Sequence, residues 1–195
     1  GAKKSPEASL RPSLDRWILS QASATAEKVS TLFKQWDFHK AGREIERFVV
    51  DDVSNWYVRR SRRRLWDEAE SDDKAACHHT LREVLAIICK LMAPISPFMP
   101  DKIHRDLFGS SVHLADWPCG SDLIEPDLPP RDIDLESRMK LARNLAEAGR
   151  RIRVESSRRQ RLPCKRGWIV GGSGVGDLSE ILSEELNVGS LELES

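Results

Sequence analysis

Five arginines fall within six residues of this chain, from Arg59 to Arg64, and only Ser61 interrupts them. No acidic residue neutralises the run from inside, and aromatic residues flank it. Guanidinium groups bind phosphates and aromatic rings stack on unpaired bases, so the pattern is typical of a nucleic-acid surface. The candidate binding residues of this run are Trp56, Tyr57, Arg59, Arg60, Arg62, Arg63, Arg64 and Trp66. The alternative is a solvated helix face whose arginines pair with acidic residues close behind them, namely Asp67, Glu68 and Glu70.

A second basic stretch leaves the end of a long amphipathic pattern and passes through Pro163. Arginines crowd the polar sides of that pattern and continue beyond it, where they could extend a contact with nucleic acid. A solvated helix face is again the alternative. The candidate residues here are Arg150, Arg151, Arg153, Arg158, Arg159 and Arg161.

Other chemistries find little support in the residue types. Cys77, His78 and His79 adjoin one another, but adjacent positions on a helix point in different directions and no second ligand pair follows, so we expect no metal site. The glycine-rich turn 171–176 lacks the lysine and the serine or threonine of a Walker loop. No compact set of His, Asp and Glu supports an enzyme site.

The composition describes a polar globular chain. Charged residues make up 32% of the 195 residues and hydrophobic residues 39%, and the net charge of zero hides an asymmetry, because residues 167–195 contain no lysine or arginine. The four cysteines lie far apart, and neither a signal peptide nor an apolar run long enough for a bilayer is present. We therefore expect reduced thiols, a cytoplasmic location and no membrane partner. The start without Met favours a fragment.

The apolar pattern predicts a bundle of helices that positions the first basic run. We expect helices from Leu14 to Lys34, from beyond Phe38 to Trp66, from Lys74 to Met92 and from Asp101 to Phe108. At roughly 100° per residue, the second helix places Ile45, Val49, Val53 and Trp56 on one apolar stripe, and Arg60 and Arg63 continue that stripe. Trp56 is therefore expected in the core more than at a base.

The remaining segments complete a mainly α fold. Residues 1–12 are predicted to be a flexible lead, 13–118 the bundle, 119–130 a linker, and 131–195 a long basic helix followed by a small α/β subdomain. Within the bundle, residues 111–118 are expected to form an extended strap that Trp117 anchors. The subdomain is predicted to contain strands at 168–170 and 191–193 and a helix at 178–186.

Five segments of the chain carry a family resemblance: 48–59 with the ending 62–66, then 92–98, 111–118, 160–163 and 184–188. These segments resemble the C-terminal anticodon-binding region of the isoleucyl-tRNA synthetases, a class I aminoacyl-tRNA synthetase family. They occur in the order of that family and cover nearly the whole chain from Leu14 onward. The residues 54–57 together with 111–114 favour the isoleucine enzymes over the related valine, leucine and methionine enzymes.

The resemblance implies that the parent protein is a ligase that joins isoleucine to its tRNA with ATP and magnesium. The HIGH-like and KMSKS-like signatures of the class I active site are absent from this sequence, so we expect an inactive fragment that needs no cofactor. The implied partners are the anticodon stem-loop of isoleucine tRNA and the catalytic domain of the same polypeptide. The alternatives are the equivalent domain of a valine, leucine or methionine enzyme, and a protein interaction module.

Overall fold

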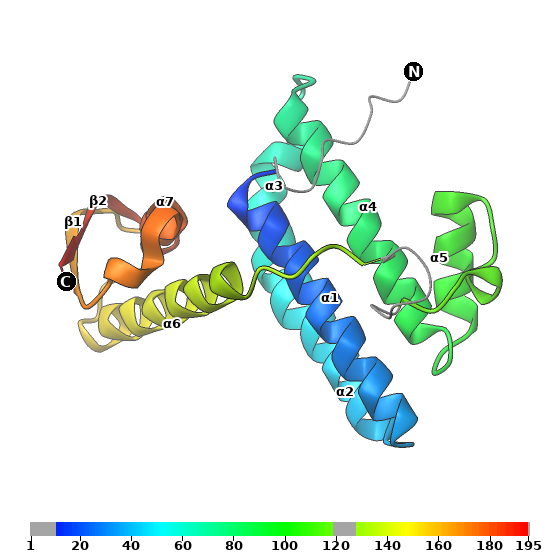
Figure 1. Cartoon of the computed structure of the whole chain (residues 1–195). Helices are drawn as coiled ribbons and strands as arrows, with labels where there is room; N and C mark the ends of the chain where they lie inside the picture. Colours follow the sequence, from blue (N-terminus) through cyan, green and yellow to red (C-terminus); the bar gives the residue numbers. More distant parts are fainter. Residues whose placement is uncertain (1–10, 119–127, 195) are drawn as a thin grey trace. The chain divides into compact units, whose positions relative to one another are not determined.

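The computed structural model describes residues 11–118 and 128–194, which fold into two compact units. Unit 1 extends to Asp132 and unit 2 begins at Ile133. Helices dominate the described residues, so the predicted mainly α fold is confirmed (Figure 1). Most of the predicted lead 1–12 and of the predicted linker 119–130 lies outside the described residues.

Unit 1 is a bundle of helices, two of which carry clear start or stop signals at their ends. Its helices are α1 Ser13–Lys34, α2 Phe38–Arg47, α3 Arg59–Trp66, α4 Asp72–Met92 and α5 Phe98–Phe108. The Ser71 hydroxyl accepts a hydrogen bond from the Lys74 amide and caps α4. Gly109, at φ 75°, ends α5 because a residue without Cβ adopts this left-handed conformation without strain.

A π-helical segment, Phe48–Val58, joins α2 to α3 in one continuous rod. A π-helix bonds each amide to the carbonyl five residues earlier, so it takes more residues per turn than an α-helix. The inward face beyond Trp56 therefore passes through Tyr57 and Ser61, which are buried, while Arg63 is exposed. The predicted continuation of the apolar stripe to Arg63 is wrong for this reason.

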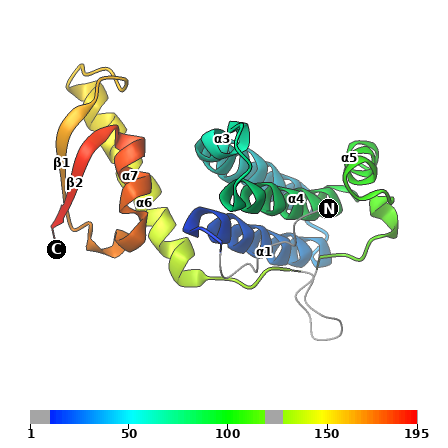
Figure 2. The same cartoon turned by 90° about the horizontal axis from the view of Figure 1, so that it is seen from above.

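The core of unit 1 forms where α1 packs against α2, the π segment and α4 (Figure 2). Its largest fully buried side chains include Trp17, Phe48 and Tyr57. The segment after α5 is not fully extended as predicted, because a 3-10 turn occupies Val112–Leu114. Trp117 does anchor it, since its indole Nε1 donates to the Ser30 hydroxyl over 2.8 Å.

Unit 2 is a helix pair beside a small sheet. Its elements are α6 Ile133–Glu155, β1 Cys164–Val170, a 3-10 turn Ser173–Leu178, α7 Ser179–Leu186 and β2 Val188–Glu194. The two strands pair in parallel, with Cys164 opposite Val188 and Trp168 opposite Glu192. Both strands are longer than predicted, and α7 packs on α6 with Gly149 against Leu186.

No helix among the described residues is long and apolar enough to cross a membrane.

Candidate nucleic-acid interface

The arginine run of unit 1 lies on α3, and the fold separates its members into outward and inward side chains. Arg59, Arg62 and Arg63 are exposed, Arg60 is half-buried, and Arg64 turns toward α1 and α4. Arg62 and Arg63 form no ion pair with any described residue. The run therefore presents positive charge on one side and uses one arginine to hold the bundle.

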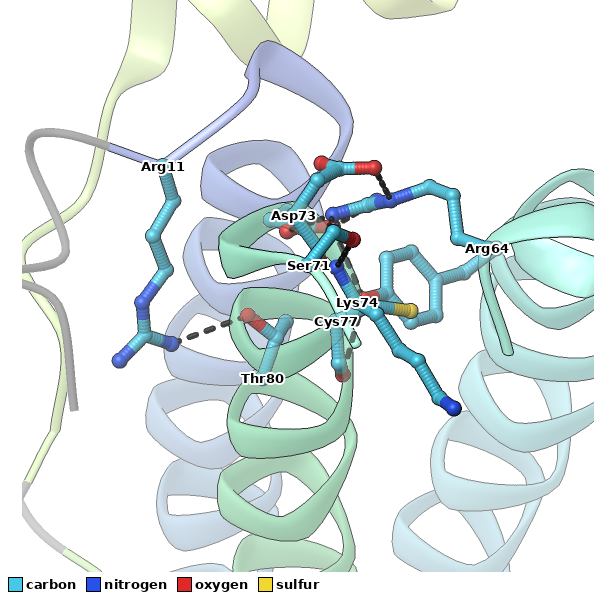
Figure 3. A network of polar contacts seen from close by, with 9 residues as sticks. Arg11, Arg64, Ser71, Asp73, Lys74, Cys77 and Thr80 are labelled. Carbon is cyan, nitrogen blue, oxygen red and sulfur yellow. Dashed lines mark hydrogen bonds and ion pairs between the residues drawn. The ribbon is translucent and has the colours of Figure 1, made fainter. Parts of the chain in front are cut away.

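Arg64 is fixed by Asp15, a fully buried carboxylate on α1, and by Asp73 on α4, whose bond to Arg64 is drawn in Figure 3. Its Nη1 and Nη2 atoms each donate to one oxygen of Asp15 over 2.8 Å, and its Nε donates to Asp73 over 2.8 Å. Burial alone would lower the pKa of Arg64, but the hydrogen bonds and the charge of Asp15 outweigh burial and raise it. The partners are not the predicted Asp67, Glu68 or Glu70, so the arrangement could not be found from acids near the run.

Tyr57 belongs to the same buried network and does not reach the surface. Its ring is fully buried, and its hydroxyl donates to Asp15 over 2.9 Å. Burial, together with the negative charge of Asp15, raises the pKa of Tyr57, so the phenol keeps its proton. The Cys77 thiol lies 3.5 Å from the same hydroxyl, and burial raises its pKa as well.

The tryptophans of the run have different environments. Trp56 is buried, as predicted, and the guanidinium of Arg60 lies 5.4 Å from the centroid of its ring. Trp66 ends α3 with 75% of its surface exposed, and the Arg62 guanidinium lies 5.2 Å from its ring centroid. Of these two tryptophans and Tyr57, only Trp66 presents a ring that an unpaired base can stack on.

In unit 2 the predicted residues also separate into engaged and outward side chains. Arg150 pairs with Glu185 over 2.6 Å, and Arg153 is buried, donating to the carbonyl oxygens of Leu162, Leu186 and Asn187. The other predicted arginines of this unit are exposed and form no ion pair with any described residue: Arg151, Arg158, Arg159 and Arg161.

Sequence reasoning missed an aromatic and basic group on the outer face of β1. Arg166 and Trp168 are exposed there, and the Arg166 guanidinium lies 5.4 Å from the centroid of the Trp168 ring. The signal is the alternation along the strand, in which Gly167 and Ile169 turn inward. This alternation predicts a strand, and it also places the Arg166 guanidinium and the Trp168 ring on one face.

In the described part of the chain, no group of three or more His, Cys, Asp or Glu side chains could hold a metal ion. Cys77 is buried against Tyr57, whereas its neighbour His78 is exposed, so the two side chains point apart.

Comparison with known proteins shows to which family the chain belongs. Residues 15–166 match the model of the anticodon-binding domain of tRNA ligases. The chain is 42% identical over 191 residues to an isoleucine–tRNA ligase of Streptomyces avermitilis and 43% identical over 191 residues to that of Thermobifida fusca. It is 39% identical over 187 residues to isoleucine–tRNA ligase 2 of Bacillus cereus.

Each of these matches covers 93% of this chain but 17% of the relative, so the similarity concerns one region of much longer proteins. In this chain, the residues 15–166 that match the family model contain the α3 arginines, the segment 111–118 and the start of β1. The chain belongs to the family of anticodon-binding domains of tRNA ligases.

Proposed function

We propose that unit 1 binds the anticodon stem and loop of an isoleucine tRNA through the outer side of α3. We name this side the α3 surface, and it consists of Arg59, Arg62, Arg63 and Trp66. The observation that carries the proposal is the exposed ring of Trp66 beside the Arg62 guanidinium, at the end of a run that contains no acidic residue.

The two kinds of side chain have separate roles in this proposal. The arginines contact phosphates, which gives affinity and a strong dependence on salt concentration. Trp66 stacks on an unpaired base of the loop, an interaction that contributes about 1–3 kcal/mol per base. Arg62 lies over the Trp66 ring and links the two roles, because it holds the ring beside the charged groups.

Arg64 has a positioning role and does not contact RNA in this proposal. Its hydrogen bonds to Asp15 and Asp73 tie α3 to α1 and α4, so the neighbouring arginines leave the helix in fixed directions. Tyr57 and Trp56 support the same helix from the core, and we leave both out of the RNA-binding surface because they are buried.

The names of the relatives support a proposal for the wider role of the protein. Their names describe isoleucine–tRNA ligases, which supports the proposal that this chain is the tRNA-binding part of such a ligase. ATP, magnesium and isoleucine would then be handled by the catalytic domain of the same polypeptide in the cytoplasm, and this part alone would be inactive. The names favour isoleucine over valine, leucine or methionine as the amino acid.

The test is binding of the purified chain to isoleucine tRNA, and to the same tRNA with a changed anticodon, over a salt series. We expect several-fold weaker binding of the changed tRNA. The variant W66A should weaken binding about 5-fold to 150-fold, the range that corresponds to one stacked base. The double variant R62Q/R63Q should reduce the slope of log K against log salt by about 1 for each phosphate that is no longer bound.

Matched controls lie at the C-terminal end of α1, far from Asp15 and α3. Lys34 and Trp36 are both exposed there, about 30 Å along the helix from Asp15, so K34Q and W36A remove a similar cation and a similar ring. Both should bind like the parent chain. Equal binding of the two tRNAs, or equal effects of W36A and W66A, would overturn the proposal and favour a protein interaction module or a general polyanion contact.

A further inference from the structure

Large apolar side chains are exposed at the end of unit 1 that lies away from the α3 arginines. Arg64 pairs with Asp15 near the start of α1 and with Asp73 near the start of α4, so both helices begin beside α3 and end at the other end of the bundle (Figure 1). The exposed residues there come from the α1–α2 turn, from the turn 93–97 with the start of α5, and from the 3-10 turn. We name them the apolar end: Trp36, Phe38, Ile95, Phe98, Met99 and Leu114.

Contacts join these three segments into one surface. The Phe38 ring centroid lies 5.5 Å from that of Phe33, which in turn lies 5.4 Å from that of Trp117, just after the 3-10 turn. On α2, a Cβ at Gly42 would lie 3.8 Å from Cδ1 of Ile95, so α2 touches the turn 93–97. The apolar end is therefore one patch and not a set of scattered residues, and a patch of this kind marks an interaction site.

A cavity opens beside the patch, between the turn 93–97 and the segment 111–118. It has a volume of about 210 Å³, and Pro94, Val112 and Trp117 are among the residues that line it. The cavity is smaller than the roughly 300–1,000 Å³ of most small-molecule sites. Its size suits a side chain of a protein that packs on unit 1.

Trp36 has a backbone conformation that tryptophan rarely adopts. The Trp36 amide donates to the Phe33 carbonyl and the Asp37 amide to the Leu32 carbonyl, each over 3.0 Å, which forms a Schellman motif with Trp36 at φ 60°. Glycine is the usual residue at this position, because a Cβ strains the left-handed conformation. The Trp36 ring meets the Phe38 ring at a centroid distance of 5.9 Å, yet 80% of Trp36 is exposed, so burial does not offset the strain. Folding of unit 1 would favour glycine here, which indicates a role for the indole ring beyond the unit.

The chemistry of the apolar end favours a permanent contact. Its six side chains are apolar, and exposed polar residues such as His39 and Lys40 lie at its rim. Permanent interfaces are more hydrophobic than transient ones, which are about as polar as the rest of a protein surface. A permanent contact is available within one polypeptide, because the matched relatives are far longer and this chain spans 17% of their length.

We infer that the apolar end of unit 1 packs against another folded part of the same polypeptide, outside residues 1–195. Trp36 and Phe98 insert into that part, and the cavity beside Trp117 receives one of its side chains. Trp36 is the anchor, since large aromatic residues dominate the energy of protein interfaces. The inference rests on the proposed function in one respect, namely that the chain belongs to a longer ligase. It does not involve the α3 surface, so the two can fail separately.

Hydroxyl-radical footprinting, followed by mass spectrometry and done without tRNA, tests this contact by comparing the chain alone with the full-length ligase. Oxidation of Trp36, Phe98, Met99 and Leu114 should be at least about fivefold slower in the ligase, because the core of an interface is fully buried. Trp66, which is exposed at the other end of unit 1, is the internal control and should react equally in both proteins. Equal oxidation of the apolar end in the two proteins would overturn the inference and indicate a separate partner.

Two other occupants would give different results, and either result would overturn the inference. A second copy of the chain would protect the apolar end in the chain alone, and light scattering would show a dimer. RNA at this end would make the W36G chain bind isoleucine tRNA more weakly than its parent.

The variant W36G tests the role of Trp36. Because glycine relieves the strain, the W36G chain alone should unfold at the temperature of its parent or about 2–4 °C higher. In the full-length ligase, W36G should speed the oxidation of Phe98 and Leu114 at least about threefold, since the anchor is lost. W66A is the matched control and should leave both rates unchanged. A lower unfolding temperature of the W36G chain, or an unchanged rate for Phe98 in the W36G ligase, would overturn the role of Trp36 as the anchor.

Discussion

The basic regions of the two units use an inward arginine in different ways. On α3, Arg64 meets a fully buried carboxylate, Asp15, so a negative charge matches its positive charge. In unit 2, the nearly buried Arg153 meets backbone carbonyl oxygens, two of which belong to Leu186 and Asn187 at the end of α7. The negative end of that helix dipole replaces a carboxylate.

The difference shows what each unit loses when its inward arginine is removed. Without Arg64, a full charge on Asp15 stays buried with no cation beside it. Without Arg153, several carbonyl dipoles lose a donor, which costs less because no net charge is left behind. In both units, however, the arginines next to the inward one remain exposed at the surface.

The strongest expected effect is therefore that of Arg64→Gln. It should lower the free energy of unfolding by about 3–5 kcal/mol, the cost of breaking a buried ion pair from one side. Urea titration followed by circular dichroism measures it. Arg63→Gln, on the outer side of the same helix, should change the value by less than about 0.5 kcal/mol.

A double substitution checks the physical cause. Asp15→Asn in the Arg64→Gln chain removes the buried charge and should recover a large part of the stability. If Arg64→Gln and Arg63→Gln had equal effects on unfolding, Arg64 would belong with the solvent-facing arginines and the comparison between the units would fail.

Arg153→Lys should lower stability by about 2 kcal/mol, less than Arg64→Gln. Lysine keeps the charge, but a single ammonium group cannot reproduce the spread of the guanidinium over Leu162, Leu186 and Asn187. Hydrogen exchange of the amides in α7 and β2 should show the loss. Arg151→Lys, on the exposed side of the same helix, is the control, and equal protection in the two variants would contradict a special role for Arg153.

Gly149→Ala examines the packing that brings Arg153 to α7. A Cβ at this position would lie 2.2 Å from Cδ2 of Leu186, so the leucine must rotate or α7 must move. We expect the free energy of unfolding to fall by about 1 kcal/mol, at the low end for overpacking because the atom in the way ends a flexible side chain. Thermal unfolding measures it. In a Leu186→Ala background the clash is absent, so Gly149→Ala should raise the free energy of unfolding by about 0.5–1 kcal/mol, because alanine favours a helix interior more than glycine does. An undiminished loss of stability there would contradict the clash.

The smallest expected effect on the free energy of unfolding concerns Asp101, a carboxylate of unit 1 that is not buried as Asp15 is. Asp101 accepts hydrogen bonds from the Ser111 hydroxyl over 2.5 Å and from Arg105 over 2.7 Å, and these bonds lower its pKa to about 2. Because the pKa is lowered in the folded state, the stabilisation is present above about pH 4 and is lost as the pH falls toward 2.

Urea unfolding at several pH values between about 2 and 5 tests this expectation. The parent chain should lose stability over that range more steeply than Asp101→Asn, which has no carboxylate to protonate there. Parallel curves for the two chains would show that the hydrogen bonds of Asp101 add nothing to stability.

Local signals were sufficient to predict the helices of unit 1. Ser71 caps α4 and Gly109 ends α5, and both signals are local because capping depends on residues within one turn of the helix end. The π segment was not predictable in this way, since its winding suits the burial of Phe48 and Tyr57 against other helices. The misplaced stripe at Arg63 followed directly from assuming α-helical winding.

The sequence by itself determined which basic and aromatic residues are candidates and in what order they occur. It also determined which elements carry the predicted arginines. Only the tertiary structure decided which arginines face inward, because Asp15 lies 49 residues before Arg64 and Leu186 lies 33 residues after Arg153. A run of identical residues carries no information about which member meets a distant carboxylate or carbonyl. The folding of the chain brings those groups together, and the cost of burying a charge without a partner then selects the arginine that turns in.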